Sequence, residues 1–135
     1  MTNRETLRSL AEQVEALSGP SHEVECLIFE ALGWTKVDNP TSAGGLFGRW
    51  YRPDGTMTGQ DGTPRVTASI DSAISLVPEG LTDLSLNQSA DASQALIFRD
   101  GDGVVGRGDA TGGAAVDRAA RAIVAASLRA IGEGL

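Results

Sequence analysis

Two arginines flank an aromatic pair in the sequence Arg49-Trp50-Tyr51-Arg52. In an extended strand, alternation places Arg49 and Tyr51 on one face and Trp50 and Arg52 on the other. An arginine beside an aromatic ring can hold a flat, anionic ligand by charge and by stacking. Together with Trp34, these four residues form the candidate ligand-binding cluster. The alternative is that Trp50 packs in the core and the arginines are solvated.

A glycine pattern at Gly101, Gly103 and Gly106 matches the fingerprint of dinucleotide-binding loops letter by letter. That fingerprint requires a helix that begins inside the loop and an acidic residue about 20 positions later. Here the next expected helix begins nearer Gly112, and the region about 20 positions on is the interior of that helix. The glycines therefore predict a hairpin turn, and we expect no cofactor.

The same turn contains Asp100 and Asp102, which resemble the start of a calcium-binding loop. An EF-hand loop needs an oxygen ligand at its fifth position and a glutamate at its twelfth, where this chain has Val104 and Thr111. The aspartates therefore indicate turn chemistry, and no metal site is predicted.

Residues typical of catalysis are scarce, because His22 is the only histidine and Cys26 the only cysteine. No serine, cysteine or aspartate accompanies His22 at the spacing of a catalytic motif, which favours a surface role. Cys26 is expected to pack as a small hydrophobic residue. The chain also lacks a nucleophile elbow, a P-loop and a histidine pair for zinc. No catalytic residue is therefore predicted.

The composition indicates one domain, residues 1–135, with 41% hydrophobic and 21% charged residues. The formal net charge of −7 argues against sequence-independent binding to nucleic-acid phosphates. The sequence has no signal-peptide pattern, and no apolar stretch approaches the ~20 residues that span a bilayer. We therefore expect a cytoplasmic protein that binds neither membranes nor nucleic acid.

Helical periodicity predicts helices at both ends of the chain, at residues 4–18, 21–32 and 114–131. Ser21 is expected to cap the second of them. The C-terminal helix is rich in alanine, which would let it approach a sheet or another helix closely. If its alanine face were exposed, it would suggest a homodimer; a monomer that buries this face against the sheet is equally compatible.

The stretch 67–80 is the clearest unit in the middle of the chain. Apolar residues recur there at helical spacing, Ser69 can cap the start, and Pro78 with Gly80 stops the helix. The expected strands lie at 34–37, 46–52, 81–87, 95–99 and from 104 onward. The sheet and this helix together span residues 46–107, and residues 54–64 are expected to form a mobile loop.

The order of these elements predicts an α/β protein of the α+β type. The first choice of architecture is a three-layer α-β-α sandwich around a small, mostly antiparallel sheet. A two-layer α+β fold is the second choice.

Four segments of the sequence resemble small phage and prophage proteins of the phage ABA sandwich type. They are LIFEALGW (27–34), GRWYRPDG (48–55), TASIDSAISLVPEG (67–80) and the AIVAASLRA that ends at Ala130. The chain departs from the family pattern at Ala110–Ala115, where a proline-containing start is more usual, and in its glycine-rich loop at 54–64. The resemblance implies alpha-beta-alpha layers and a phage origin, and it carries over no activity or catalytic residue.

These observations favour a non-enzymatic accessory protein of a phage or prophage that binds a protein partner or a small anionic ligand. Sequestration of a host nucleotide signal, as a counter-defence, is one form this binding could take. An enzyme acting on a nucleotide or phosphorylated substrate is the alternative, with His22 or the glycine-rich loop as its site. A structural or assembly component of the phage is the third interpretation.

Overall fold

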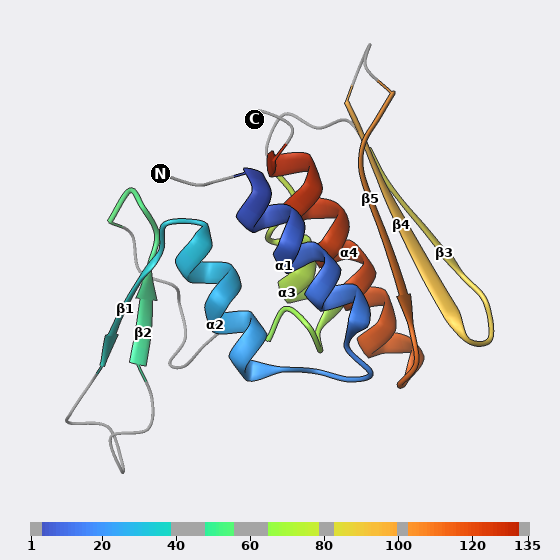
Figure 1. Cartoon of the computed structure of the whole chain (residues 1–135), viewed down its shortest axis with the longest axis horizontal. Helices are drawn as coiled ribbons and strands as arrows, with labels where there is room; N and C mark the ends of the chain where they lie inside the picture. Colours follow the sequence, from blue (N-terminus) through green and yellow to red (C-terminus); the bar gives the residue numbers. More distant parts are fainter. Residues whose placement is uncertain (1–3, 39–47, 56–64, 79–82, 100–102, 133–135) are drawn as a thin grey trace.

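The computed structural model describes residues 4–38, 48–55, 65–78, 83–99 and 103–132. Within these ranges it contains the helices α1 (Arg4–Ala16), α2 (His22–Ala31), α3 (Ile70–Ile74) and α4 (Ala115–Gly132). The strands β1 (Thr35–Asp38) and β2 (Gly48–Tyr51) form an antiparallel pair. The strands β3 (Asp83–Gln88), β4 (Ala92–Arg99) and β5 (Gly103–Thr111) form a separate antiparallel sheet in that order (Figure 1).

Helix α4 is the centre of the molecule, because it packs against β4 and β5 on one side and against α1 on the other (Figure 1). From Arg118 to Leu128 every residue of α4 is buried. Helix α1 contributes an apolar stripe at the helical spacing of three and four residues: Leu7, Leu10, Ala11 and Val14. The alanine-rich face of α4 is therefore covered within the chain and is not an exposed dimer surface.

Two glycines of β5 let α4 lie almost directly on the sheet. A Cβ atom on Gly106 would stand 2.2 Å from the carbonyl oxygen of Ala126, and one on Gly108 would stand 2.1 Å from that of Ala122. No side chain fits into such a space, so only glycine permits this approach of helix and strand. Gly106, the last glycine of the apparent fingerprint, thus serves close packing, and the chain from Gly103 to Thr111 is a strand where a dinucleotide fingerprint needs a helix.

Helices α2 and α3 begin where the sequence predicts a cap. The Ser21 side chain accepts a hydrogen bond from the Val24 amide, and the Ser69 side chain accepts one from the Ser72 amide. Helix α3 nevertheless ends at Ile74, before the predicted stop at Pro78. After Ile74 the backbone continues in tight turns with bonds between residues three apart, and the described segment ends at Pro78.

A buried carboxylate fixes the segment before α3 onto α2. Glu25 is 2% exposed, and it accepts hydrogen bonds from the backbone amide of Thr67 at 3.0 Å and from its hydroxyl at 2.8 Å. The same hydroxyl oxygen accepts a bond from the Ser21 amide at 2.9 Å. The charge of Glu25 is thus satisfied by fixed donors, as burial of a carboxylate requires.

The predicted α+β class, with a small antiparallel sheet packed against helices, is confirmed. Across Figure 1 the layers follow in the order sheet, helices and β1–β2 pair. The sheet face that points away from α4 carries alternate residues such as Leu96, Phe98 and Arg107, and no described helix covers it in this view.

Candidate functional site

The structure divides the predicted cluster around residue 50 between the core and the surface. Trp50 has no exposed surface, and its ring lies 5.6 Å from that of Phe29. The ring of Trp34 lies 4.7 Å from that of Phe29, and Trp34 is only half-buried. The Arg52 guanidinium stands over Trp34 at 5.4 Å from the ring centroid. Trp50 is thus a core residue, while Trp34 and Arg52 form a cation–π pair at the surface.

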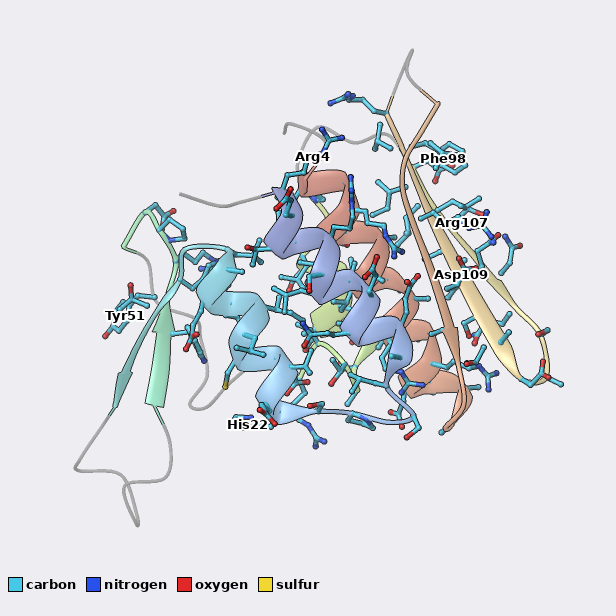
Figure 2. The ribbon with its side chains drawn as sticks, in the orientation of Figure 1. Arg4, His22, Tyr51, Phe98, Arg107 and Asp109 are labelled. Carbon is cyan, nitrogen blue, oxygen red and sulfur yellow. The ribbon has the colours of Figure 1, made fainter. Side chains whose placement is uncertain are left out.

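The remaining two residues of the cluster, Arg49 and Tyr51, belong to β2. Tyr51 is half-buried and pairs in register with Thr35, and its side chain points away from the helices in Figure 2. The backbone of Arg49 pairs with Val37, and the side chain of Arg49 lies outside the described part of the structure. The described side chains of the cluster therefore do not converge on one ligand.

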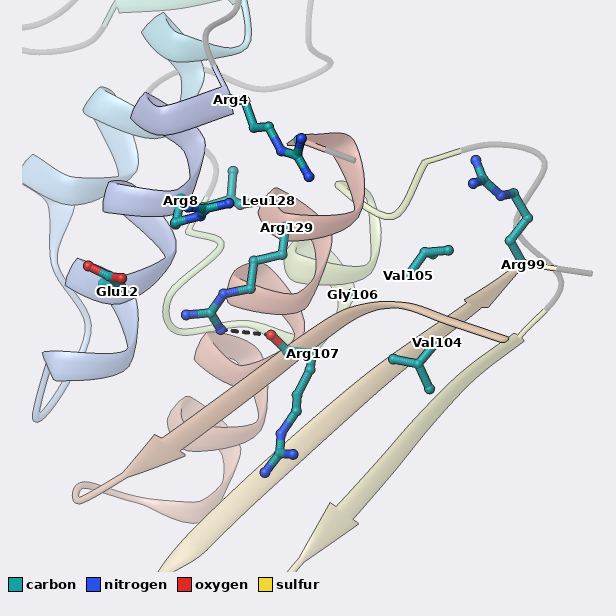
Figure 3. A pocket seen from close by; sticks show the side chains of 11 residues that line it. Arg4, Arg8, Glu12, Arg99, Val104, Val105, Gly106, Arg107, Leu128 and Arg129 are labelled. Carbon is teal, nitrogen blue, oxygen red and sulfur yellow. Dashed lines mark hydrogen bonds between the residues drawn. The ribbon is translucent and has the colours of Figure 1, made fainter. Parts of the chain in front are cut away.

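A different group of arginines gathers at the end of the molecule where α1 begins and α4 ends. They surround a pocket of about 620 Å³, which we call the arginine pocket (Figure 3). Its basic residues come from four elements: Arg4 and Arg8 from α1, Arg99 from β4, Arg107 from β5 and Arg129 from α4. The sequence alone does not indicate this site, because its residues are separated by up to 125 positions along the chain (from Arg4 to Arg129).

Arg129 is held in place at the centre of this group. It donates to both carboxylate oxygens of Glu15 at 2.6 Å and to the carbonyl oxygen of Arg107 at 2.7 Å. The hydrogen bonds to Glu15 raise the pKa of Arg129 further above its ordinary range. Glu15 also accepts from the Asp109 amide at 2.8 Å, so a single carboxylate joins α1, β5 and α4. This junction fixes the walls of the pocket relative to one another.

Arg107 is paired with Asp109 on the outer face of β5, at 3.0 Å. Partial burial raises the pKa of Asp109, but hydrogen bonds from Arg107 and Gln94 and the charges of Arg107 and Arg129 outweigh it. The net result is a pKa below the ordinary 3.8. The Asp109 carboxylate thus holds the Arg107 guanidinium on the outer face of the sheet.

We expect the pairing of Asp109 to make stability depend on pH. Because its pKa is lowered on folding, its contribution is present in full above 3.8 and is lost as the pH falls through the lower, folded-state value. Asp109→Asn should remove this part of the dependence. Urea denaturation between about pH 5 and pH 2 should therefore show a smaller acid-induced loss of unfolding free energy in the variant. Equal losses in the two proteins would contradict this assignment.

The other arginines of the pocket stand on opposite sides of it. Figure 3 shows Arg4 and Arg8 on the α1 side and Arg99 on the sheet side, where Val104 and Val105 also lie. Arg8 is exposed and makes no hydrogen bond or ion pair with any residue that the structure describes. Guanidinium groups present fixed pairs of N–H donors that match the oxygens of phosphates and carboxylates. The pocket can therefore bind anions.

Two further arginines near the start of α4 are buried and serve the fold. Arg118 donates to the carbonyl oxygen of Ser89 at 3.0 Å and to the hydroxyl of Ser93 at 3.2 Å, which ties α4 to the turn between β3 and β4. Arg121 donates to the carbonyl oxygen of Gly112 at 2.7 Å, and burial lowers its pKa. Its Nε and Nη1 atoms have no hydrogen-bond partner in the described structure, so burial of this guanidinium lowers the free energy of unfolding.

Two residues whose side chains are typical of catalytic and metal sites, His22 and Cys26, lie next to one another on α2. The Sγ atom of Cys26 lies 3.6 Å from Nε2 of His22, and Cys26 is partly buried and packs against the hydrophobic core. Among the described residues no group of three or more histidine, cysteine, aspartate or glutamate side chains could hold a metal ion. Asp100 and Asp102 lie outside the described residues.

Comparison with protein families, curated proteins and solved structures finds no match for this chain. The resemblance to phage ABA sandwich proteins thus stays a prediction. In the part of the chain that the structure describes, no helix has the length and apolar character needed to cross a membrane.

Proposed function

We propose that this protein is a non-enzymatic binding protein that holds a small anion in the arginine pocket. The observation that carries the proposal is the concentration of charge. Five of the eleven lysine and arginine residues line this one pocket, although the chain as a whole has a formal net charge of −7. An acidic surface elsewhere would direct an anion toward such a local basic region.

The composition of the pocket favours binding over catalysis. Its described lining contains Glu12 as the single carboxylate and no histidine, cysteine or serine. A general acid–base pair or an activated nucleophile would need such residues within hydrogen-bonding distance of one another. The volume, about 620 Å³, lies within the range of small-molecule sites.

The resemblance noted in the sequence adds a biological setting to this proposal. A phage or prophage protein with such a pocket would act in the cytoplasm of the bacterial host. There it could bind a host anion, such as a nucleotide signal, and keep it from its receptor without converting it. The surface pair of Trp34 and Arg52 is a second place where an anionic, aromatic ligand or a protein partner could dock.

Titration with inorganic phosphate, followed by ¹H–¹⁵N chemical shifts at low salt, tests the site. Shifts should concentrate on residues around Arg8, Gly106 and Arg129. Arg8→Ala should weaken binding about tenfold, because one charge-assisted hydrogen bond to a ligand contributes about 1.4 kcal/mol. Low salt is needed because exposed charges are screened.

Arg52→Ala distinguishes the two places, since it removes the arginine of the Trp34 pair and leaves the arginine pocket intact. Binding should be unchanged in this variant. If Arg52→Ala weakened binding while Arg8→Ala did not, the ligand site would lie at Trp34 and Arg52. An absence of any shift with phosphate would refute anion binding in the arginine pocket.

A further inference from the structure

The two edges of the three-stranded sheet differ in how their backbone groups are used. At the β5 edge, the Asp109 amide donates to the Glu15 carboxylate at 2.8 Å, and the carbonyl oxygen of Arg107 accepts from Arg129 at 2.7 Å. Helices α1 and α4 thus supply hydrogen-bond partners to that edge. The other edge is β3, which pairs only with β4 and lies at the right-hand margin of the molecule in Figure 1.

Two hydrogen bonds show which backbone groups of β3 point toward the open edge. The Ser89 amide donates to the carbonyl oxygen of Ala92 at 2.8 Å, in the same register that pairs β3 with β4. Backbone groups alternate in direction along an antiparallel strand, so every second residue before Ser89 also faces β4. The residues between them face outward, and these are Leu84, Leu86 and Gln88. The Leu84 amide agrees with this assignment, because it donates to the side chain of Asp83 at 2.8 Å.

Strand β3 lacks the features that usually keep an edge strand from pairing with another chain. Its sequence, DLSLNQ, contains no proline, lysine or arginine, and its register with β4 has no bulge. One carboxylate, that of Asp83, occupies the Leu84 amide at the start of the strand. The rest of this edge has no hydrogen-bond partner among the residues that the structure describes.

The side chains of β3 match those of a second copy of the same strand. Leu84 and Leu86 are half-buried against the core, and Ser85 and Asn87 alternate with them on the outer face of the sheet. In antiparallel pairing centred on Leu86, leucine meets leucine on one face and serine meets asparagine on the other. The same register places the two Asp83 carboxylates at opposite ends of the pair, about 20 Å apart, so they do not repel one another strongly.

We propose that this protein forms a homodimer in which the β3 strands of two copies pair antiparallel about a two-fold axis at Leu86. Leu86 bonds to Leu86 of the second copy, and Leu84 bonds to the second copy's Gln88. The sheet then runs through both copies in the order β5-β4-β3-β3-β4-β5. Such a dimer uses the same surface on both subunits, as the commonest soluble oligomers do. The proposal goes beyond the proposed function and does not depend on the arginine pocket.

Size-exclusion chromatography with light scattering measures the mass in solution over a wide range of concentration. The protein should show a species of twice the 14.0 kDa chain mass. Leu86→Pro should raise the dimer dissociation constant about thirtyfold or more, because proline removes the central amide from both copies. Proline is tolerated where the amide of an edge strand faces outward, so circular dichroism should show that the variant stays folded.

Oxidative cross-linking tests the register independently of Leu86→Pro. In a Cys26→Ser background, Leu86→Cys places two thiols across the axis with Cα atoms about 5.5 Å apart, within the range of a disulfide. Leu84→Cys is the matched control, because it replaces another half-buried leucine of β3 and leaves the two cysteines about 14 Å apart. We expect a covalent dimer from Leu86→Cys and none from Leu84→Cys.

A single species of 14.0 kDa at every concentration would overturn the proposal. A dimer that persists in folded Leu86→Pro would overturn it as well, since β3 would then not be the interface. Cross-linking of Leu84→Cys as readily as of Leu86→Cys would overturn the register. None of these measurements uses phosphate, so failure of anion binding would leave the dimer in place.

Discussion

Replacement of Gly108 by alanine is expected to lower the free energy of unfolding by about 3 kcal/mol or more, at the upper end of the cost of overpacking a core. The added Cβ would lie 2.1 Å from the carbonyl oxygen of Ala122, 2.7 Å from the amide nitrogen of Ala126 and 3.0 Å from the Cβ of Ala125. Two of these neighbours are backbone atoms of a buried helix, which cannot rotate away as a long side chain could. The helix would have to separate from β5 along much of its length.

Thermal and urea denaturation followed by circular dichroism measures this effect, which corresponds to about 10 °C in melting temperature for a domain of this size. Gly19→Ala is the control, because nothing lies within 4 Å of the added Cβ and the backbone there does not have a positive φ. The control should be as stable as the wild type. Wild-type stability in Gly108→Ala would show that α4 does not pack on β5 as described.

The contact between α4 and the two glycines of β5 explains what the sequence could and could not predict about the fold. The alanines of the last helix do indicate close packing, and their partners are two glycines at alternate positions of a strand, Gly106 and Gly108. Yet glycine and aspartate disfavour strands, so the pattern predicted a turn and only the start of a strand at 104. Strand β5 continues to Thr111 because packing against α4 overrides the local preference.

The candidate site was less accessible to prediction than the fold. The cluster around Trp50 stands out because its residues are adjacent in sequence, whereas Arg8, Arg99 and Arg129 share no local pattern. Their proximity depends on the antiparallel packing of α1 on α4 and on the position of β4 and β5 beside α4. A single sequence contains no information on such long-range neighbours until the topology is known.

Replacement of Trp50 by alanine is expected to lower the free energy of unfolding by about 3–5 kcal/mol, the usual cost of removing a large buried aromatic ring. Trp50 is completely buried and packs on Phe29, which in turn contacts Trp34. Its removal would leave a cavity between α2 and the β1–β2 pair and would loosen both. Urea denaturation measures the change, and Trp50→Phe should lose much less because it retains an aromatic ring.

Arg52→Ala separates a core role of this cluster from a ligand-binding role. The Arg52 guanidinium rests on Trp34 at the surface, so its loss should cost less than about 1 kcal/mol. We expect Trp50→Ala to be severely destabilised and Arg52→Ala to bind phosphate normally. Together these results would show that Trp50 belongs to the core and that the ligand binds elsewhere. Trp50→Ala could instead keep wild-type stability and lose anion binding. Trp50 would then contact the ligand, and the ligand site would lie beside β2 rather than between α1 and β5.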